Sequence, residues 1–111
     1  MACGWHTGMG SGALLVEAVN YILDETGQPK QIEDIIQWAR WFEKADRSLR
    51  QTQIGDALIS TVFLGADHSF GSGPPILWET MIFGGIHDQY QERYDSREAA
   101  LVGHDRLVEK V

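Results

Sequence analysis

The hydrophobic pattern of the chain predicts a helix over 31–49. Apolar residues recur there at intervals of three and four, which places them on one face of a helix. That face comprises Ile32, Ile35, Ile36, Ala39, Phe42, Ala45 and Leu49, with Trp38 and Trp41 on its flank. The opposite face is polar, so the helix is expected to lie across an apolar surface with its other side in water.

Runs rich in β-branched and aromatic residues predict strands before and after this helix. The predicted strands cover 19–23, 49–54, 58–64, 76–83 and 89–94. Glycine follows the first strand at Gly27 and stands between the second and third at Gly55, next to Asp56. Such residues favour tight turns, so the second and third strands are expected to form a hairpin.

A second helix is expected after the last strand. Asp95 is suited to cap it, with Glu98 three positions later as in a capping box. Its apolar face would comprise Ala100, His104, Leu107, Val108 and Val111. This order predicts an α+β fold, in which an antiparallel sheet of about four to five strands carries two helices on one face.

Composition limits the class of protein. The chain has 111 residues and a formal charge of −7, which suits one domain and disfavours DNA as the principal partner. We expect a glycine-rich arm over 1–18 and a single α+β domain over 19–111. Cys3 is the only cysteine, and we find no secretory or membrane-spanning pattern, so a cytoplasmic location is expected.

The loop from Gly65 to Pro75 (GADHSFGSGPP) is the strongest candidate for a binding site. It is longer than a tight hairpin requires, and its glycines allow backbone N–H groups to approach an anion. It lacks the Gly-Lys-Ser/Thr of a nucleotide-binding P-loop. The alternative is a structural surface loop with Phe70 packed into the core.

Three histidines stand beside an aspartate: His68, His87 and His104. Their convergence would allow zinc binding or acid–base catalysis, but no pair has metal-ligand spacing. We therefore predict no metal, no cofactor and no catalytic residue. In the structural alternative His104 forms hydrogen bonds inside the fold and His87 lies in a turn.

Glu79 stands within the apolar run ILWETMIF, where a buried carboxylate needs a partner. Either Glu79 faces solvent or a subunit boundary, or it meets an arginine such as Arg40, Arg47 or Arg93, or a hydroxyl or amine of a ligand. Both faces of this strand are mostly apolar, which favours a homo-oligomer that covers the face left free by the helices. Aromatic side chains near the loop are expected to stack on a flat ligand. The predicted ligand-binding residues are His68, Ser69, Phe70, Gly71, Ser72, Gly73, Trp78, Glu79, Tyr90 and Arg93.

The segment STVFLGADHSFGSGPPILWETMIFGG, with WARWFEKADR before it and YDSREAALVGH after it, resembles a family of small uncharacterised proteins of phages and bacterial genomes. The resemblance covers about 21–111 and implies a phage-type protein, with a counter-defence role as one function, but it implies no chemistry. We expect the protein to bind and sequester a nucleotide-like signalling ligand without turnover, in the host cytoplasm. Two alternatives remain open: an acidic inhibitor that binds a host protein, and a small hydrolase that uses His, Asp and Glu.

Overall fold

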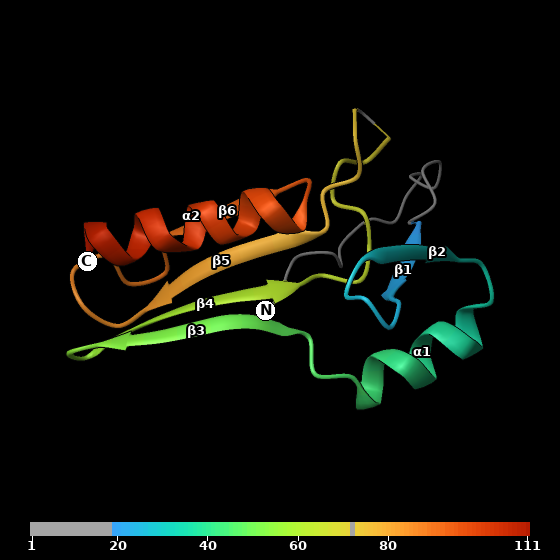
Figure 1. The fold of residues 1–111 in the computed structure, drawn as a ribbon, viewed down its shortest axis with the longest axis horizontal. Coiled ribbons are helices and arrows are strands. Elements are labelled where there is room, and N and C mark those ends of the chain that lie inside the picture. The colour runs from blue at the N-terminus through green and yellow to red at the C-terminus, as the bar shows by residue number, and fades with distance from the viewer. Residues whose placement is uncertain (1–18, 72) are drawn as a thin grey trace, which may run out of the picture.

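Two helices and two antiparallel sheets make up residues 19–71 and 73–111, the part of the chain that the computed structural model describes (Figure 1). The elements are β1 (Asn20–Leu23), β2 (Pro29–Ile32), α1 (Ile35–Lys44), β3 (Ser48–Ile54), β4 (Ala57–Phe63), β5 (Trp78–Phe83), β6 (Gln91–Tyr94) and α2 (Arg97–Lys110). The predicted α+β class is confirmed, and the five predicted strands are present with ends within two residues of the prediction. The expected N-terminal arm and Ser72 lie outside the described residues.

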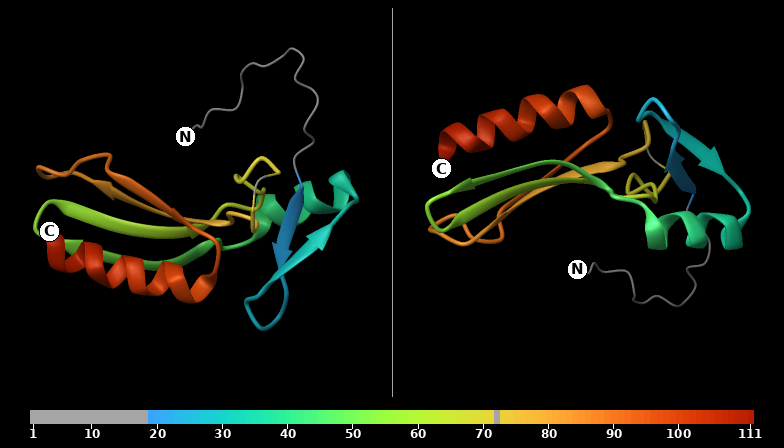
Figure 2. Two further views of the ribbon diagram at one scale, coloured as in Figure 1. Left: turned by 90° about the horizontal axis from the view of Figure 1, so that it is seen from above. Right: turned by 60° about the horizontal axis from the view of Figure 1, so that its bottom comes forward.

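The larger sheet has the order β3-β4-β5-β6, and α2 lies along one of its faces (Figure 2). Because side chains alternate along a strand, every second residue of β4 and β5 faces this helix. Ile59 and Ile82 pack with Leu107 of α2, and Phe63 and Trp78 pack with Ala100. These two clusters form the core between helix and sheet.

The second helix begins one residue later than predicted. Ser96 caps it, since its Oγ accepts a hydrogen bond from the backbone N–H of Ala99 at 3.0 Å. The predicted cap at Asp95 is therefore wrong. Gly103 faces the sheet and lies so close to the ring of Tyr94 that a Cβ there would overlap it, which explains how α2 approaches β6 closely.

The first helix is shorter than predicted because both ends of 31–49 form strands. Asp34 caps α1, with its carboxylate accepting hydrogen bonds from the N–H groups of Ile36 and Gln37. The residues before it form β2, which pairs with β1 across the turn at Gly27. After Lys44, the chain turns into β3 at the edge of the larger sheet.

The predicted apolar face of α1 is also only partly correct, since Ile35 and Ile36 are exposed. Trp38, on the predicted flank, donates from its indole Nε1 to the carbonyl oxygens of Tyr21 and Gly65, both at 3.1 Å. Phe42 lies directly against Gly65, where a Cβ would be only 2.8 Å from its ring. The helix therefore packs beside β1 and the start of the glycine loop, beyond the end of the larger sheet (Figure 2).

None of the helices in the described ranges is both long and apolar enough to cross a membrane.

Candidate functional site

The glycine loop leaves the end of β4 and runs beside β1. The N–H of Tyr21 donates to the carbonyl of Gly65 at 2.8 Å, and the N–H of Asp67 donates to the carbonyl of Val19 at 2.9 Å. These bonds attach the start of the loop to the smaller sheet.

Asp67 organises the loop from within. Its Oδ1 accepts hydrogen bonds from the N–H groups of Ser69 at 2.7 Å and Ile76 at 2.9 Å, and Oδ2 accepts from the hydroxyl of Ser69 at 2.9 Å. Partial burial opposes ionisation, but these bonds outweigh it and hold the pKa of Asp67 below its ordinary value. The N–H groups of Ser69, within the loop, and of Ile76, directly after it, are therefore bound to the carboxylate of Asp67 and are not directed at an external anion.

Phe70 does not pack into the core. The alternative of a structural loop anchored by a buried Phe70 is therefore wrong. Its side chain is 70% exposed and its φ is 55°, which is unusual for a residue other than glycine. The His68 ring lies 6.1 Å from the Phe70 ring, and its Nδ1 is hydrogen-bonded to the Ala66 carbonyl at 2.8 Å. Gly71 and Gly73 are exposed next to Phe70. The role of these loop residues in binding remains a prediction.

Trp78 cannot stack on a ligand in this structure because it is 1% exposed. Its ring packs 5.0 Å from that of Phe63 in the core beneath α2. The indole Nε1 finds no hydrogen-bond partner among the described residues. Trp78 is thus a core residue, which is a correction to the predicted site.

Glu79 pairs with Arg93, one of its three predicted partners. The two residues are opposite each other on β5 and β6, and Arg93 Nε donates to Glu79 Oε2 at 3.0 Å. Both side chains lie on the face of the sheet opposite α2. Tyr90, another predicted site residue, precedes β6 and makes no contact with this pair that the structure records.

The three histidines do not come together. His104 is buried beneath α2, where its Nδ1 is hydrogen-bonded to Thr61 Oγ1 at 2.7 Å and its Nε2 to Thr52 Oγ1 at 2.9 Å. His68 lies in the glycine loop after β4, whereas His87 lies in the turn after β5, at the other end of the sheet. Within the described ranges, no three His, Cys, Asp or Glu side chains are arranged to hold a metal ion.

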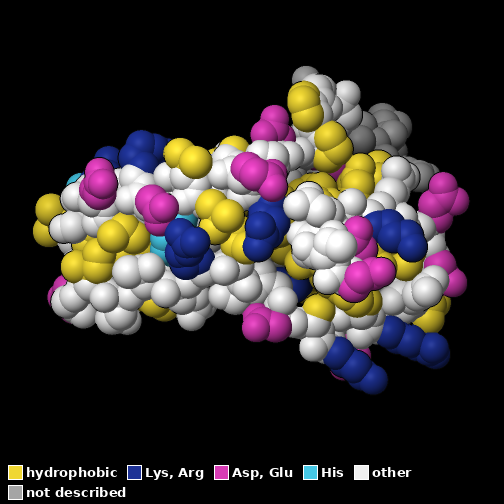
Figure 3. Space-filling view, viewed as in Figure 1, with side chains coloured by type: hydrophobic (Ala, Val, Ile, Leu, Met, Phe, Trp, Pro, Cys, Tyr) yellow, Lys and Arg dark blue, Asp and Glu magenta, His cyan; other side chains and the backbone are white. Residues whose placement is uncertain are grey.

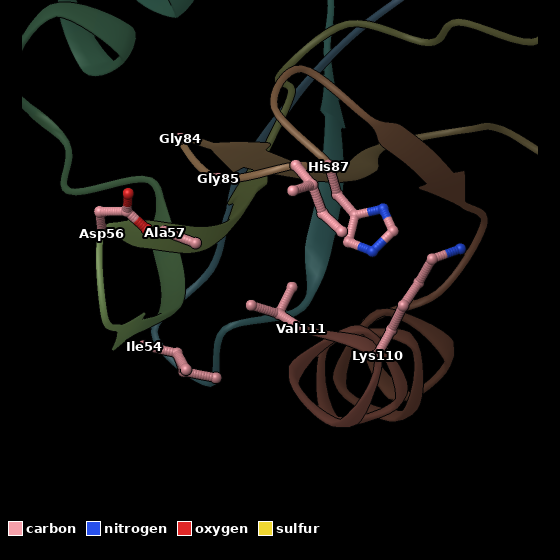
Figure 4. Close-up of a pocket in the computed structure, with 9 residues that line it drawn as sticks. Ile54, Asp56, Ala57, Gly84, Gly85, His87, Lys110 and Val111 are labelled. Atoms are coloured by element: carbon pink, nitrogen blue, oxygen red, sulfur yellow. The ribbon is translucent and has the colours of Figure 1, made fainter.

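A pocket that the sequence reasoning missed lies at this other end of the sheet, where α2 ends. Its volume is about 570 Å³, within the range of small-molecule sites. It is formed by the β3–β4 turn, the β5–β6 turn and the last residues of α2 (Figure 4). Its lining residues are Ile54, Asp56, Ala57, Gly84, Gly85, Ile86, His87, Lys110 and Val111. Hydrophobic side chains gather at this end of the molecule, at the left of Figure 3.

Gly84 allows the β3–β4 and β5–β6 turns to approach each other closely at the pocket. Gly84 has a φ of 93°, and a Cβ on it would collide with the backbone carbonyl of Asp56. The N–H of Gly84 donates to the carboxylate of Asp88 at 2.6 Å, which fixes the β5–β6 turn. Ile86, at the tip of this turn, is 94% exposed. The β5–β6 turn, which forms one side of the pocket, is marked in the sequence by the Gly-Gly pair followed by Ile86 and His87.

Lys110 stands at the end of α2, whose last turn is anchored by the buried Leu107. Its Nζ lies 4.8 Å from the centroid of the Tyr90 ring, within cation–π range. The Tyr90 hydroxyl donates to Glu92, which also pairs with Arg106. The hydrogen bond from Arg106 is the main cause that lowers the pKa of Glu92 to about 2, and the bond to Glu92 raises the pKa of Tyr90. Tyr90 is therefore a predicted site residue that contacts this pocket through Lys110, although it does not line it.

The pocket combines three kinds of chemistry. Lys110 and His87 lie on one side and Asp56 on the other (Figure 4). Apolar side chains of Ile54, Ile86 and Val111 complete the lining. Such a pocket can hold an anionic group beside the basic residues, a hydrogen-bond donor near Asp56 and an apolar or flat body between them.

The chain matches no protein-family model, no curated protein sequence and no solved structure.

Proposed function

We propose that this protein binds a small anionic ligand of the nucleotide class in the pocket at the end of α2 and holds it without turnover. The observation that carries the proposal is the placement of Lys110 and His87 opposite Asp56 around a pocket of about 570 Å³ with mixed polar and apolar lining. Phosphate would lie near Lys110, and the amino or hydroxyl groups of a base or sugar would donate to Asp56.

Sequestration is favoured over hydrolysis because the residues that could act as acid and base are engaged or separated. His104 is enclosed by threonines in the core, and Asp67 accepts hydrogen bonds within its own loop. His87 and Asp56 line the pocket from two different turns. Binding alone needs only the complementary charges and the apolar lining.

The biological proposal follows from the resemblance of the STVFLG to FGG core to phage-type proteins. A protein that binds a signalling nucleotide tightly would withdraw it from the cytoplasm of the host cell without any reaction. This role needs a high concentration of the protein and slow release of the ligand, but no catalytic group.

The first test measures thermal unfolding with cyclic dinucleotides and with isomers of cyclic ADP-ribose. A ligand at one hundred times its dissociation constant stabilises the folded protein by about 2.7 kcal/mol, which corresponds to a rise in Tm of roughly 10 °C for a domain of this size. Ligand released by denaturing the protein should be chemically intact. If no member of this panel raises Tm, or if the released ligand is cleaved, the proposal of sequestration is wrong.

Variants then locate the site. Lys110→Met removes the cation but keeps the aliphatic stem, so the dissociation constant should rise roughly ten- to hundredfold. Lys30→Met is the matched control, because Lys30 is an exposed lysine of β2 outside the pocket, and it should bind normally. Phe70→Ala tests the glycine loop. A loss of affinity in Phe70→Ala alone, with Lys110→Met unchanged, would place the ligand at the loop and refute the pocket.

A further inference from the structure

Lys110, the lysine that lines the pocket, lies against an aromatic ring. Its Nζ is 4.8 Å from the centroid of the Tyr90 ring, and Tyr90 is 38% exposed. Among the described residues, the ion pairs are formed by arginines, and Lys110 takes part in none of them. The ring attracts the ammonium group but does not neutralise its charge as a carboxylate would. The charge of Lys110 therefore stays available to an anion in the pocket.

The carboxylate that holds Tyr90 is engaged with other groups. Glu92 accepts hydrogen bonds from the hydroxyls of Tyr90 at 2.7 Å and Tyr94 at 3.1 Å. It also pairs with Arg106, which precedes Lys110 by one turn of α2, so both basic side chains lie on the same side of the helix. A carboxylate that is already paired with a guanidinium attracts a second cation only weakly. Glu92 therefore does not draw Lys110 away from the ring.

Tyr90 is itself fixed at both ends. Its backbone N–H donates to the carbonyl of His87 at 3.0 Å, and its carbonyl accepts from the N–H of Ile82 at 3.0 Å. Its hydroxyl is held by Glu92. The ring therefore has a set orientation beside the pocket, whereas a lysine side chain on its own is flexible.

We infer that Tyr90 is a positioning residue of the pocket, which holds the ammonium group of Lys110 in place for the negative group of a ligand. Ordering a flexible lysine when the ligand binds weakens affinity, and the ring reduces this cost in advance. The phosphate of a ligand then lies beside Lys110, and its base or sugar lies towards the apolar Ile54 and Val111 (Figure 4). Tyr90 thus acts through Lys110 instead of stacking on the ligand. The inference rests on the proposed function for the nature of the ligand.

The ring current of Tyr90 provides a first test that needs no ligand. The lysines of the chain are Lys30, Lys44 and Lys110, so the NMR signals of their ε-methylene groups can be assigned one by one. Protons above an aromatic face are shielded, and the ε-methylene signal of Lys110 should lie upfield of the other two in the free protein. Tyr90→Phe keeps the ring and should keep this shift, whereas Tyr90→Leu should abolish it.

Inorganic pyrophosphate, which carries the charged group of a nucleotide without its base, then tests the positioning. Added to the full chain, it should change the ε-methylene signal of Lys110 in a saturable way. In Tyr90→Leu the lysine must be ordered on binding, so the dissociation constant should rise roughly two- to tenfold. Tyr90→Phe is the matched control and should bind pyrophosphate as the wild type does. Unchanged amide signals in the rest of the chain show that each variant is folded.

The outcomes separate this inference from the proposed function. Pyrophosphate binding that weakens in Tyr90→Leu supports the inference, even if no cyclic dinucleotide or cyclic ADP-ribose isomer binds and the proposed nucleotide class is therefore wrong. Three results would overturn the inference, even if a nucleotide binds: no upfield shift of the Lys110 signal, no response of that signal to pyrophosphate, or equal affinity of Tyr90→Leu and the wild type.

Discussion

Replacing His104 by leucine tests whether the buried histidine and its threonines stabilise the fold. The imidazole is enclosed between α2 and the sheet and links Thr52 to Thr61, which in turn is hydrogen-bonded to Thr80 at 2.5 Å. Leucine has a similar volume but no hydrogen-bonding group. The hydroxyls of Thr52 and Thr61 each lose a partner, although Thr61 keeps Thr80.

The expected cost is about 1–3 kcal/mol, the usual penalty for buried polar groups that lose their partners. In urea, with a slope of about 1 kcal/mol per molar, the unfolding midpoint should fall by about 1–3 M. Tryptophan fluorescence can follow the transition. His87→Leu is the matched control, because the His87 ring makes no side-chain hydrogen bond with a described residue, and its midpoint should change little. An unchanged midpoint in His104→Leu would refute the reasoning.

The pH dependence gives a second readout of the same residue. Burial is the largest cause that lowers the pKa of His104, and Arg50 lowers it further, while Asp105 opposes them. The unfolded chain takes up a proton near pH 6.5 where the folded chain does not. The contribution of His104 to the free energy of unfolding should therefore be at its maximum above about pH 6.5. It should decrease as the pH falls towards the pKa of His104 in the folded state. This decline should be absent in His104→Leu.

Three further substitutions test local features of the fold. Gly103→Ala inserts a methyl group where Tyr94 packs and should lower stability by about 1–3 kcal/mol; an unchanged Tm would contradict the close approach of α2. Arg106→Ala should raise the pKa of Glu92 from about 2 towards 4.5, measured by NMR titration. The stability that Glu92 contributes is present above about pH 4.5 and is lost as the pH falls towards 2 in the wild type, and this loss should shrink in the variant. Asp34→Ala removes the cap of α1 and should cost about 1 kcal/mol, whereas Asp46→Ala, beyond the end of α1, should leave the helix content measured by circular dichroism unchanged.

The strands of the larger sheet could be predicted because their own residue types and spacing favour a strand, without information from distant parts of the chain. In β4 and β5, β-branched and aromatic residues occupy the positions that face α2, and Gly55 marks the turn before β4. His104 was also placed correctly, since its spacing from Leu107 puts both on the inner face of α2.

The sequence pattern failed where pairing depends on distant residues. PKQI has no strand alternation, and it forms β2 because it pairs with β1. Leu49 continues the helical spacing of α1, but it lies in β3, where it packs towards the core formed by Phe63 and Trp78. In each case a tertiary contact outweighs the local preference.

The pocket was missed for a related reason. Its lining comes from three segments, around Asp56, Gly84 and Lys110, and no one segment contains a motif. The glycine loop has the stronger local sequence signal. In the structure, however, the carboxylate of Asp67 already accepts hydrogen bonds from the backbone N–H groups of Ser69 and Ile76. Local composition therefore identified a loop, whereas the pocket depends on how the two hairpins and α2 end at the same place.

The most direct test of ligand binding at the end of α2 is a chemical-shift titration with isotope-labelled protein. Cyclic dinucleotides and cyclic ADP-ribose isomers are added in turn, and the backbone amides of Gly84, Gly85 and Lys110 are compared with those of Gly71 and Gly73. Binding in the pocket predicts saturable shifts at the first three amides and small changes in the loop. Shifts confined to Gly71 and Gly73, or none with any of these ligands, would contradict it.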